Sequence, residues 1–340
     1  MKKALLCVAI LALMAGSAYA ADWNFYGSAR VETFYTSNDA NDTDNFSETL
    51  QGNARIGARV KVSDELSGRF EYGASSGNAN IRLLYGTWDF GAGKLRVGQD
   101  YTPLYLPISN QVYNGDNGLD GWGEPAPSRT AQLKLMFGNF QVAALEPGND
   151  YYNGTSVVDT TTETKLPRLE ARYRVKMDNW WAAAAAGYNT FEVNSDEDID
   201  SYIGTLAGGF KVGQFSMDAE VFAGENVGNL IGASDVANSA DSGKGYAQYT
   251  GGALSDNEAF GYEIVAAYMF NEMFSIEAGL GYQEFELDGA DENEVWACYL
   301  QLPITMAPGV FVVPEIGQID YEEDGEGDIT YFGAKWQINF

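Results

Sequence analysis

Residues 331–340, YFGAKWQINF, end the chain in an alternation of two kinds of side chain. One parity carries Phe332, Ala334, Trp336, Ile338 and Phe340. The other carries Tyr331, Gly333, Lys335, Gln337 and Asn339. A β-strand places these two sets on opposite faces, and a tilted strand of about ten residues is long enough to cross a bilayer. The stretch therefore predicts an amphipathic strand, which belongs to either a membrane barrel or a soluble β-sandwich.

The same alternation recurs along the chain, for example in residues 53–62, NARIGARVKV. A single strand of this kind does not separate a barrel from a sandwich, because basic residues can face a lumen or bulk water. The number of strands does separate them. Sixteen are predicted, over residues 23–36, 48–62, 66–75, 80–89, 94–101, 129–137, 140–145, 167–176, 180–192, 201–212, 214–223, 259–270, 273–287, 293–304, 309–321 and 328–340.

The connections between these strands alternate in length. Short turns fall at 63–65, 91–93, 138–139, 178–179, 213, 271–272 and 306–309. Longer segments fall between them, at 37–47, 102–128, 146–166, 193–200, 224–258, 288–292 and 322–327. Transmembrane barrels have short periplasmic turns and long external loops, and an even number of strands closes without a free edge. The sequence therefore predicts an all-β fold, a transmembrane antiparallel barrel of sixteen strands over residues 21–340.

The first twenty residues are predicted to be a signal peptide, cleaved after Ala20. Lys2 and Lys3 precede an apolar stretch that ends before the small-residue pattern Ala18-Tyr19-Ala20, as in exported proteins. Removing this segment leaves 18 basic residues against 48 acidic ones, a formal charge of −30. So acidic a chain is not expected to bind nucleic acid, whose phosphates require Lys and Arg.

The mature chain resembles the general porins of Gram-negative bacteria along its whole length. The resemblance rests on the opening residues 23–27, WNFYG, on the terminal Phe340, and on a long segment directly after the fifth predicted strand. It implies an outer-membrane homotrimer in contact with lipid and lipopolysaccharide. It also implies that the third external loop, residues 102–128 with GWGEP at 121–125, folds into the barrel. The implied function is passive diffusion of small hydrophilic solutes and ions, without a cofactor.

Six arginines on the early strands have apolar neighbours at odd offsets: Arg30, Arg55, Arg59, Arg69, Arg82 and Arg96. Facing lipid, each would cost roughly 2–4 kcal/mol at mid-membrane, and six would exceed the stability of a typical domain, about 5–15 kcal/mol. We therefore predict that they face the lumen. The resemblance places Asp116, Asp120 and Glu124 of the third loop across the constriction from them. The alternative is that each arginine pairs locally, for example Arg30 with Glu32 or Arg69 with Glu71.

The composition also bears on functions other than an open pore. The chain contains no histidine, so a Ser-His or Asp-His catalytic site cannot form, and we predict neither an enzyme nor catalytic residues. The acidic external loops are predicted to be solvated rather than to bind a metal. The acidic total favours a slight preference for cations. Two alternatives stay open: a substrate-specific channel for sugar or phosphate, and a non-conducting structural barrel or adhesin.

Overall fold

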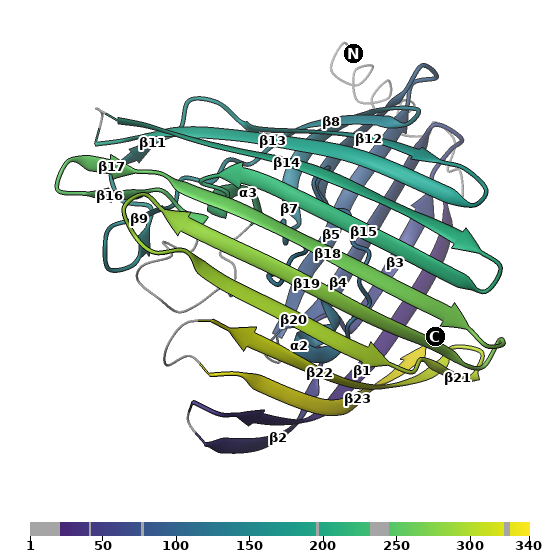
Figure 1. Cartoon of the computed structure of the whole chain (residues 1–340). Helices are drawn as coiled ribbons and strands as arrows, with labels where there is room; N and C mark the ends of the chain where they lie inside the picture. Colours follow the sequence, from purple (N-terminus) through teal and green to yellow (C-terminus); the bar gives the residue numbers. More distant parts are fainter. Residues whose placement is uncertain (1–20, 41, 76–77, 195–196, 232–244, 323–326) are drawn as a thin grey trace, which may run out of the picture.

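The computed structural model describes residues 21–40, 42–75, 78–194, 197–231, 245–322 and 327–340 (Figure 1). The predicted signal peptide, residues 1–20, lies outside the described residues. Among the residues described, no helix is both long and apolar enough to cross a membrane.

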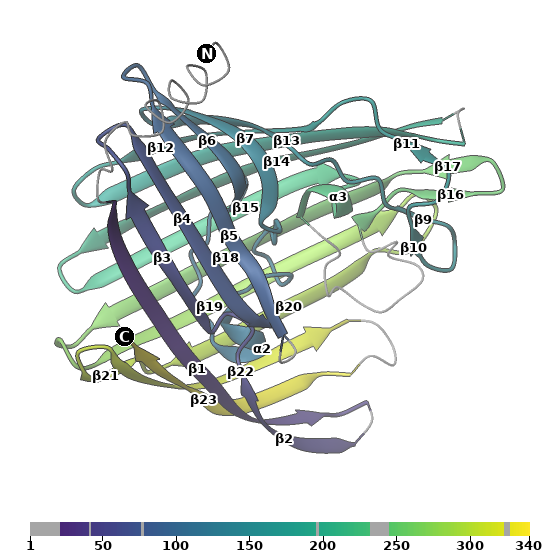
Figure 2. The same cartoon turned by 180° about the vertical axis from the view of Figure 1, so that it is seen from behind.

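A single antiparallel sheet forms a closed barrel in which each strand pairs with the next along the chain (Figures 1 and 2). Its first half comprises β1 (Asp22–Asn38), β2 (Thr43–Leu50), β3 (Arg55–Lys61), β4 (Leu66–Ser75), β5 (Asn78–Asp89), β6 (Lys94–Asp100), β7 (Thr130–Phe137), β8 (Phe140–Leu145) and β12 (Arg168–Lys176). Its second half comprises β13 (Trp180–Val193), β14 (Glu197–Val212), β15 (Phe215–Glu225), β18 (Asn257–Met269), β19 (Ser275–Leu287), β20 (Asn293–Gln301), β21 (Ile304–Ala307), β22 (Val310–Tyr321) and β23 (Ile329–Asn339).

Two of the barrel strands are interrupted, so these eighteen segments make sixteen strands. β2 and β3 follow one another along β1, and β20 and β21 follow one another along β22. The second interruption falls at Leu302-Pro303, because proline has no N–H to donate to the ladder. The predicted barrel of sixteen strands is confirmed.

Several short strands and helices lie in the long connections of the barrel. A four-stranded sheet contains β9 (Tyr151–Tyr152), β10 (Val157–Val158), β16 (Gln248–Thr250) and β17 (Ala253–Ser255). β11 (Thr162–Glu163) pairs with the end of β13. Two one-turn helices are α2 (Tyr113–Asp116) and α3 (Gly228–Ile231). The predicted loop at 193–200 is largely strand, because β13 and β14 stay paired as far as Val193 and Glu197.

The terminal strand β23 shows which face meets lipid. Phe332, Trp336 and Ile338 are 57, 50 and 54 % exposed on the outside, whereas Tyr331 is fully buried on the inside. Similar apolar side chains cover the outer surface of other strands, including Ile56 and Leu206. A wall that is apolar outside and polar inside is suited to lipid rather than to water.

The barrel closes between its first and last strands. β1 pairs with β23 from Ser28↔Asn339 to Asn38↔Ile329. Gly27 and Phe340 exchange two backbone hydrogen bonds of 2.7 and 3.0 Å. A Cβ on Gly27 would lie 2.5 Å from the Phe340 ring, so glycine is the residue that lets this ring cover the seam. Figure 2 shows the chain's C-terminus beside β1, near β21.

The interior is filled on one side by residues 101–129, which we call the inner loop. Both cartoons place its helix α2 inside the barrel outline. Apolar side chains of the loop join a core cluster with the wall of β13 to β22. The loop contributes Leu104, Leu106, Leu119 and Trp122 to that cluster. One side of the barrel is therefore packed, and open space remains on the side of β1 to β6.

Candidate functional site

Carboxylates of the barrel wall hold the inner loop by its backbone. Glu170 on β12 accepts a hydrogen bond from the N–H of Leu104 at 3.1 Å. Glu315 on β22 accepts hydrogen bonds from two consecutive backbone groups, the N–H of Val112 at 2.8 Å and of Tyr113 at 2.9 Å. Charge-assisted bonds of this kind are stronger than neutral ones. The loop is thus fixed on two distant strands and crosses the lumen between them.

A cavity of about 790 Å³ lies between the inner loop and the early strands. Its charged lining consists of five cationic side chains and two carboxylates, a net of three positive charges. The lining cations are Arg30, Arg55, Arg82, Arg129 and Lys335, and the lining carboxylates are Asp116 and Asp120. Polar groups such as Asn53, Asn80, Gln99, Tyr101 and Gln337 complete the wall. A hydrated space of this size and charge is suited to small polar solutes.

Asp116 joins the inner loop to the closing seam of the barrel. Its carboxylate forms ion pairs with Arg30 of β1 and with Lys335 of β23, the latter at 2.6 Å. The amide of Asn53 donates to the same carboxylate at 3.1 Å and to the backbone carbonyl of Asp116 at 2.8 Å. Asp116 has a positive φ of 62°, a conformation that aspartate and asparagine tolerate better than most residues. One carboxylate therefore serves two cations.

Glu71 organises three of the early arginines in the same way. It is fully buried on β4, and it also accepts a hydrogen bond from Tyr26 at 2.8 Å. Its ion pairs run to Arg82 at 2.9 Å, Arg69 at 2.9 Å and Arg55 at 3.5 Å. Three guanidinium groups share a single negative charge, so this wall of the lumen stays positive.

The nine residues singled out from the sequence do not all meet. Five line the cavity together: Arg30, Arg55, Arg82, Asp116 and Asp120. Arg59 and Arg69 lie over the Tyr26 ring. Arg96 lies over Tyr85 and pairs with Asp100 at 2.5 Å, beside a second cavity of about 290 Å³. Glu124 is 1 % exposed and is absent from the lining of the cavity.

Sequence reasoning missed two cationic residues of the cavity, Lys335 and Arg129. Lys335 stands on the polar parity of the terminal strand, and the register of the closed barrel places it opposite Glu32 of β1. The sequence shows the parity of Lys335, but its neighbours across the seam are known only once the first and last strands are paired. Glu32 itself accepts hydrogen bonds from Gln51 and from the N–H of Gly115, so the suggested Arg30–Glu32 pair gives way to Arg30–Asp116.

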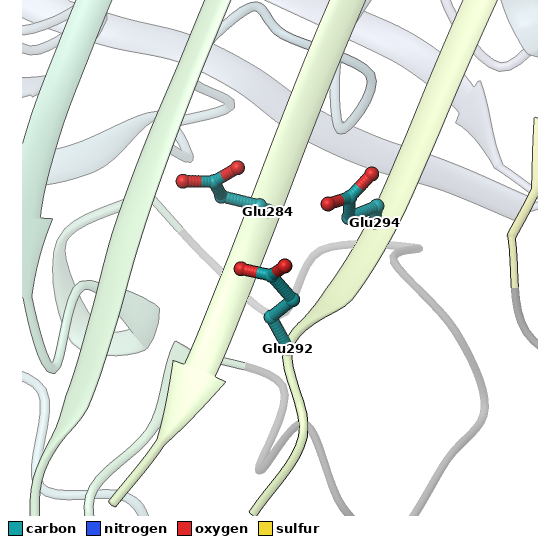
Figure 3. Close-up of side chains that lie close together, drawn as sticks. All are labelled: Glu284, Glu292 and Glu294. Carbon is teal, nitrogen blue, oxygen red and sulfur yellow. The ribbon is translucent and has the colours of Figure 1, made fainter.

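The outer wall carries a separate acidic group near the long-loop end. Glu284, Glu292 and Glu294 have carboxylate oxygens within 4.8 Å of one another (Figure 3). Glu284 and Glu294 are cross-strand partners on β19 and β20, on the parity opposite to the buried Gln283 and Val295. They therefore face outward, and Glu292 is exposed.

The sequence model described as Gram-negative porin matches residues 7–324. The chain belongs to the Gram-negative porin family. Its members are outer-membrane channels for passive diffusion rather than enzymes, which confirms the predicted localisation, function class and absence of enzymatic activity. Comparison with curated protein sequences gives no significant match.

Solved structures with the same fold include several outer-membrane channels. The outer membrane channel DcaP of Acinetobacter baumannii is similar with a TM-score of 0.74 at 19 % identity, over 95 % of this porin and 99 % of that chain. The anion-selective porin of Comamonas acidovorans has a TM-score of 0.66 at 12 % identity, over 94 and 100 %. OmpF of Salmonella typhi, in a complex with daunomycin, has a TM-score of 0.64 at 14 % identity, over 93 and 97 %. These likenesses concern the fold.

Proposed function

We propose that the cavity beside the inner loop is the constriction of the pore, and that it passes small hydrophilic solutes with a preference for anions. The observation that carries this proposal is its lining of five cationic groups against two carboxylates. Rings of charged side chains set ion preference in narrow pores. The total charge of the chain predicted a slight preference for cations. Those acidic groups are spread over the whole chain, and salt at 0.1 M screens exposed charges beyond about 10 Å. The charges that line the constriction are therefore expected to decide the selectivity.

A second basic region supports the same direction of selectivity. The smaller, adjacent cavity is lined by Arg96, Lys134 and Arg172 together with the single carboxylate of Asp100. The two cavities share Tyr101 and Tyr105, whose rings stack at 4.4 Å. An anion leaving the constriction would meet further cationic groups along this wall. One structural neighbour is described as anion-selective, so the fold is compatible with such a preference.

We further propose that the porin is a homotrimer embedded among outer-membrane lipid and lipopolysaccharide. Among its structural neighbours, OmpT of Vibrio cholerae is described in a trimer form. The exposed apolar wall is the surface that would contact lipid. Native electrophoresis before and after heating tests the oligomeric state, and migration as a monomer under mild conditions would contradict it.

Planar-bilayer recording tests the proposed pore. We expect conductance steps in groups of three and a reversal potential of anion-selective sign in a KCl gradient. Absence of conductance would refute the open pore and favour a structural barrel. A cation-selective reversal potential would refute the assignment of this cavity as the selective constriction. Saturable block by phosphate or by a sugar would favour a substrate-specific channel instead.

A further inference from the structure

Two tyrosines stand between the two cavities of the lumen. Of the described residues, only Tyr101 and Tyr105 line both the cavity of about 790 Å³ and the smaller one of about 290 Å³. Their ring centroids lie 4.4 Å apart and their planes are inclined by 12°. Both side chains are half-buried, so part of each ring faces open space. The stacked pair is therefore a wall that the two cavities share, and we call it the tyrosine partition.

The local sequence brings these two rings together. Residues 101–105 read YTPLY, and the N–H of Tyr105 donates to the carbonyl of Thr102 at 3.2 Å. Proline suits the second position of such a turn, because its φ is already fixed. The turn reverses the chain, so residue 105 returns to the side of residue 101. The N–H of the buried Leu104 donates to Glu170, which holds the turn against the barrel wall.

Basic side chains fix the partition in place. The Tyr101 hydroxyl accepts hydrogen bonds from Arg82 at 3.2 Å and from Arg129 at 3.4 Å. The guanidinium group of Arg129 also lies over the Tyr101 ring, 5.4 Å from its centre, where a cation is attracted to the ring face. The backbone carbonyls of the pair accept hydrogen bonds of 2.8 Å, from Lys134 to Tyr101 and from Arg172 to Tyr105.

The two cavities follow one another along the barrel. The smaller one is lined by Arg96, Met136 and Gln141, which lie near the short turns that join β5 to β6 and β7 to β8. The larger one reaches Asn80 and Ile81, at the opposite end of β5. A solute that crosses the barrel along this wall passes from one cavity to the other and must pass the tyrosine partition.

We propose that the tyrosine partition sets the size limit of the pore. This proposal rests on the proposed function in one respect, that solutes cross the barrel through these cavities. Selectivity in narrow channels depends on the diameter of the pore as well as on its charge. A small solute passes beside the stacked rings without moving them. A bulkier one has to separate the rings and break the hydrogen bonds that Arg82 and Arg129 make to Tyr101.

Tyr105→Ala removes one ring and joins the two cavities, while the carbonyl that Arg172 binds remains. The swelling rate of proteoliposomes in uncharged sugars of increasing size measures the size limit, and it does not depend on ion preference. We expect the rate for a trisaccharide, relative to that for a monosaccharide, to rise at least about twofold, because a wider aperture admits bulkier solutes. Tyr101→Ala, which removes the other ring, should change the rates in the same direction.

Tyr113→Ala separates loss of the partition from a general loosening of the inner loop. Tyr113 belongs to the same loop and stacks on Tyr331 with ring centroids 3.9 Å apart, but it lines neither cavity. Its relative rates should therefore equal those of the wild type. Tyr105→Phe puts a ring back at the partition and should restore the exclusion that Tyr105→Ala loses. The change in electrophoretic mobility on heating shows that each variant is folded.

Each outcome decides for or against the partition. A raised trisaccharide rate in Tyr105→Ala or Tyr101→Ala, with wild-type rates in Tyr113→Ala and Tyr105→Phe, supports it. Unchanged relative rates in both alanine variants of the pair overturn it and leave the open pore intact. An equal rise in Tyr113→Ala also overturns it, because loosening of the loop would then explain the effect. Failure of the wild type to admit even the monosaccharide overturns the proposed pore itself, and the size limit with it.

Discussion

Asp116→Asn removes one negative charge from the proposed constriction with little change in shape. Asparagine has the size of aspartate and tolerates the positive φ of 62° at this position. The carboxylate that neutralises Arg30 and Lys335 disappears, so the lining changes from five cations and two carboxylates to five and one. The net charge of the constriction rises from three to four.

The size of the effect follows from the distance between that charge and a passing ion. A unit charge about 6 Å from a monovalent ion contributes roughly 0.7 kcal/mol in water. Screening at 0.1 M salt, with a Debye length of about 10 Å, reduces this to roughly 0.4 kcal/mol. The change acts with opposite signs on K⁺ and Cl⁻, so their relative permeability should move by roughly 0.8 kcal/mol, or about fourfold.

Reversal potentials in a tenfold KCl gradient at low total salt measure this change. We expect the Asp116→Asn variant to move toward anion selectivity, and the shift to shrink at molar salt. Asp64→Asn is the matched control, because Asp64 is an exposed turn residue that pairs with Lys61. An unchanged reversal potential in the Asp116 variant, or an equal shift in the control, would refute the assignment of the constriction.

Other groups of the barrel and the inner loop can be tested by substitution, deletion or a change of pH. Glu71→Gln leaves the buried Arg82 and the half-buried Arg55 and Arg69 without their shared anion, so thermal or chemical unfolding should show a loss of about 3–5 kcal/mol; a loss below 1 kcal/mol would contradict this. Gly123→Val places a side chain against wall backbone and should make single-channel currents noisier, whereas quiet wild-type currents would argue against the tight loop contact. Deleting Phe340 removes both of its hydrogen bonds to Gly27 and should lower the yield of heat-modifiable folded porin; a normal yield would count against its role in closure. Burial and neighbouring carboxylates raise the pKa of Glu124, so the folded state holds its proton more tightly than the unfolded state does. The melting temperature should therefore fall as pH rises above the ordinary carboxyl pKa of about 4.3; Glu124→Gln should reduce that slope, and equal slopes would contradict it.

The fold could be predicted because it depends on a local pattern. Each barrel strand alternates in parity whatever its neighbours are, so Phe332 and Trp336 could be assigned to the outside from the sequence alone. The break between β2 and β3 could not. There the chain turns so that the side chain of Gln51 donates to the carbonyl of Val112 in the inner loop, a contact between residues 61 positions apart.

The site was less predictable, because its charges come from segments that meet only in the closed barrel. The parity of the strands predicts that Arg55 and Arg82 point inward. That both pair with Glu71 could be known only from the register of β3, β4 and β5. The resemblance placed Glu124 opposite the arginines, and the turn at Gly123 directs it to the opposite wall instead. Glu124 is therefore buried and does not line the cavity beside the arginines.

The seam between β1 and β23 also determines the order of events during assembly. Thr33 and Ala334, which pair across it, are 301 positions apart in the chain. Loop-closure entropy makes such a contact costlier by about 3 kcal/mol than a hairpin of about ten residues. It is therefore expected to form last, and until then the sheet has two free edges that can pair with other chains. A growing or truncated chain lacks β23, so its edge strands stay unpaired. The barrel is therefore protected from aggregation through its edges only once the last strand is made and paired with β1.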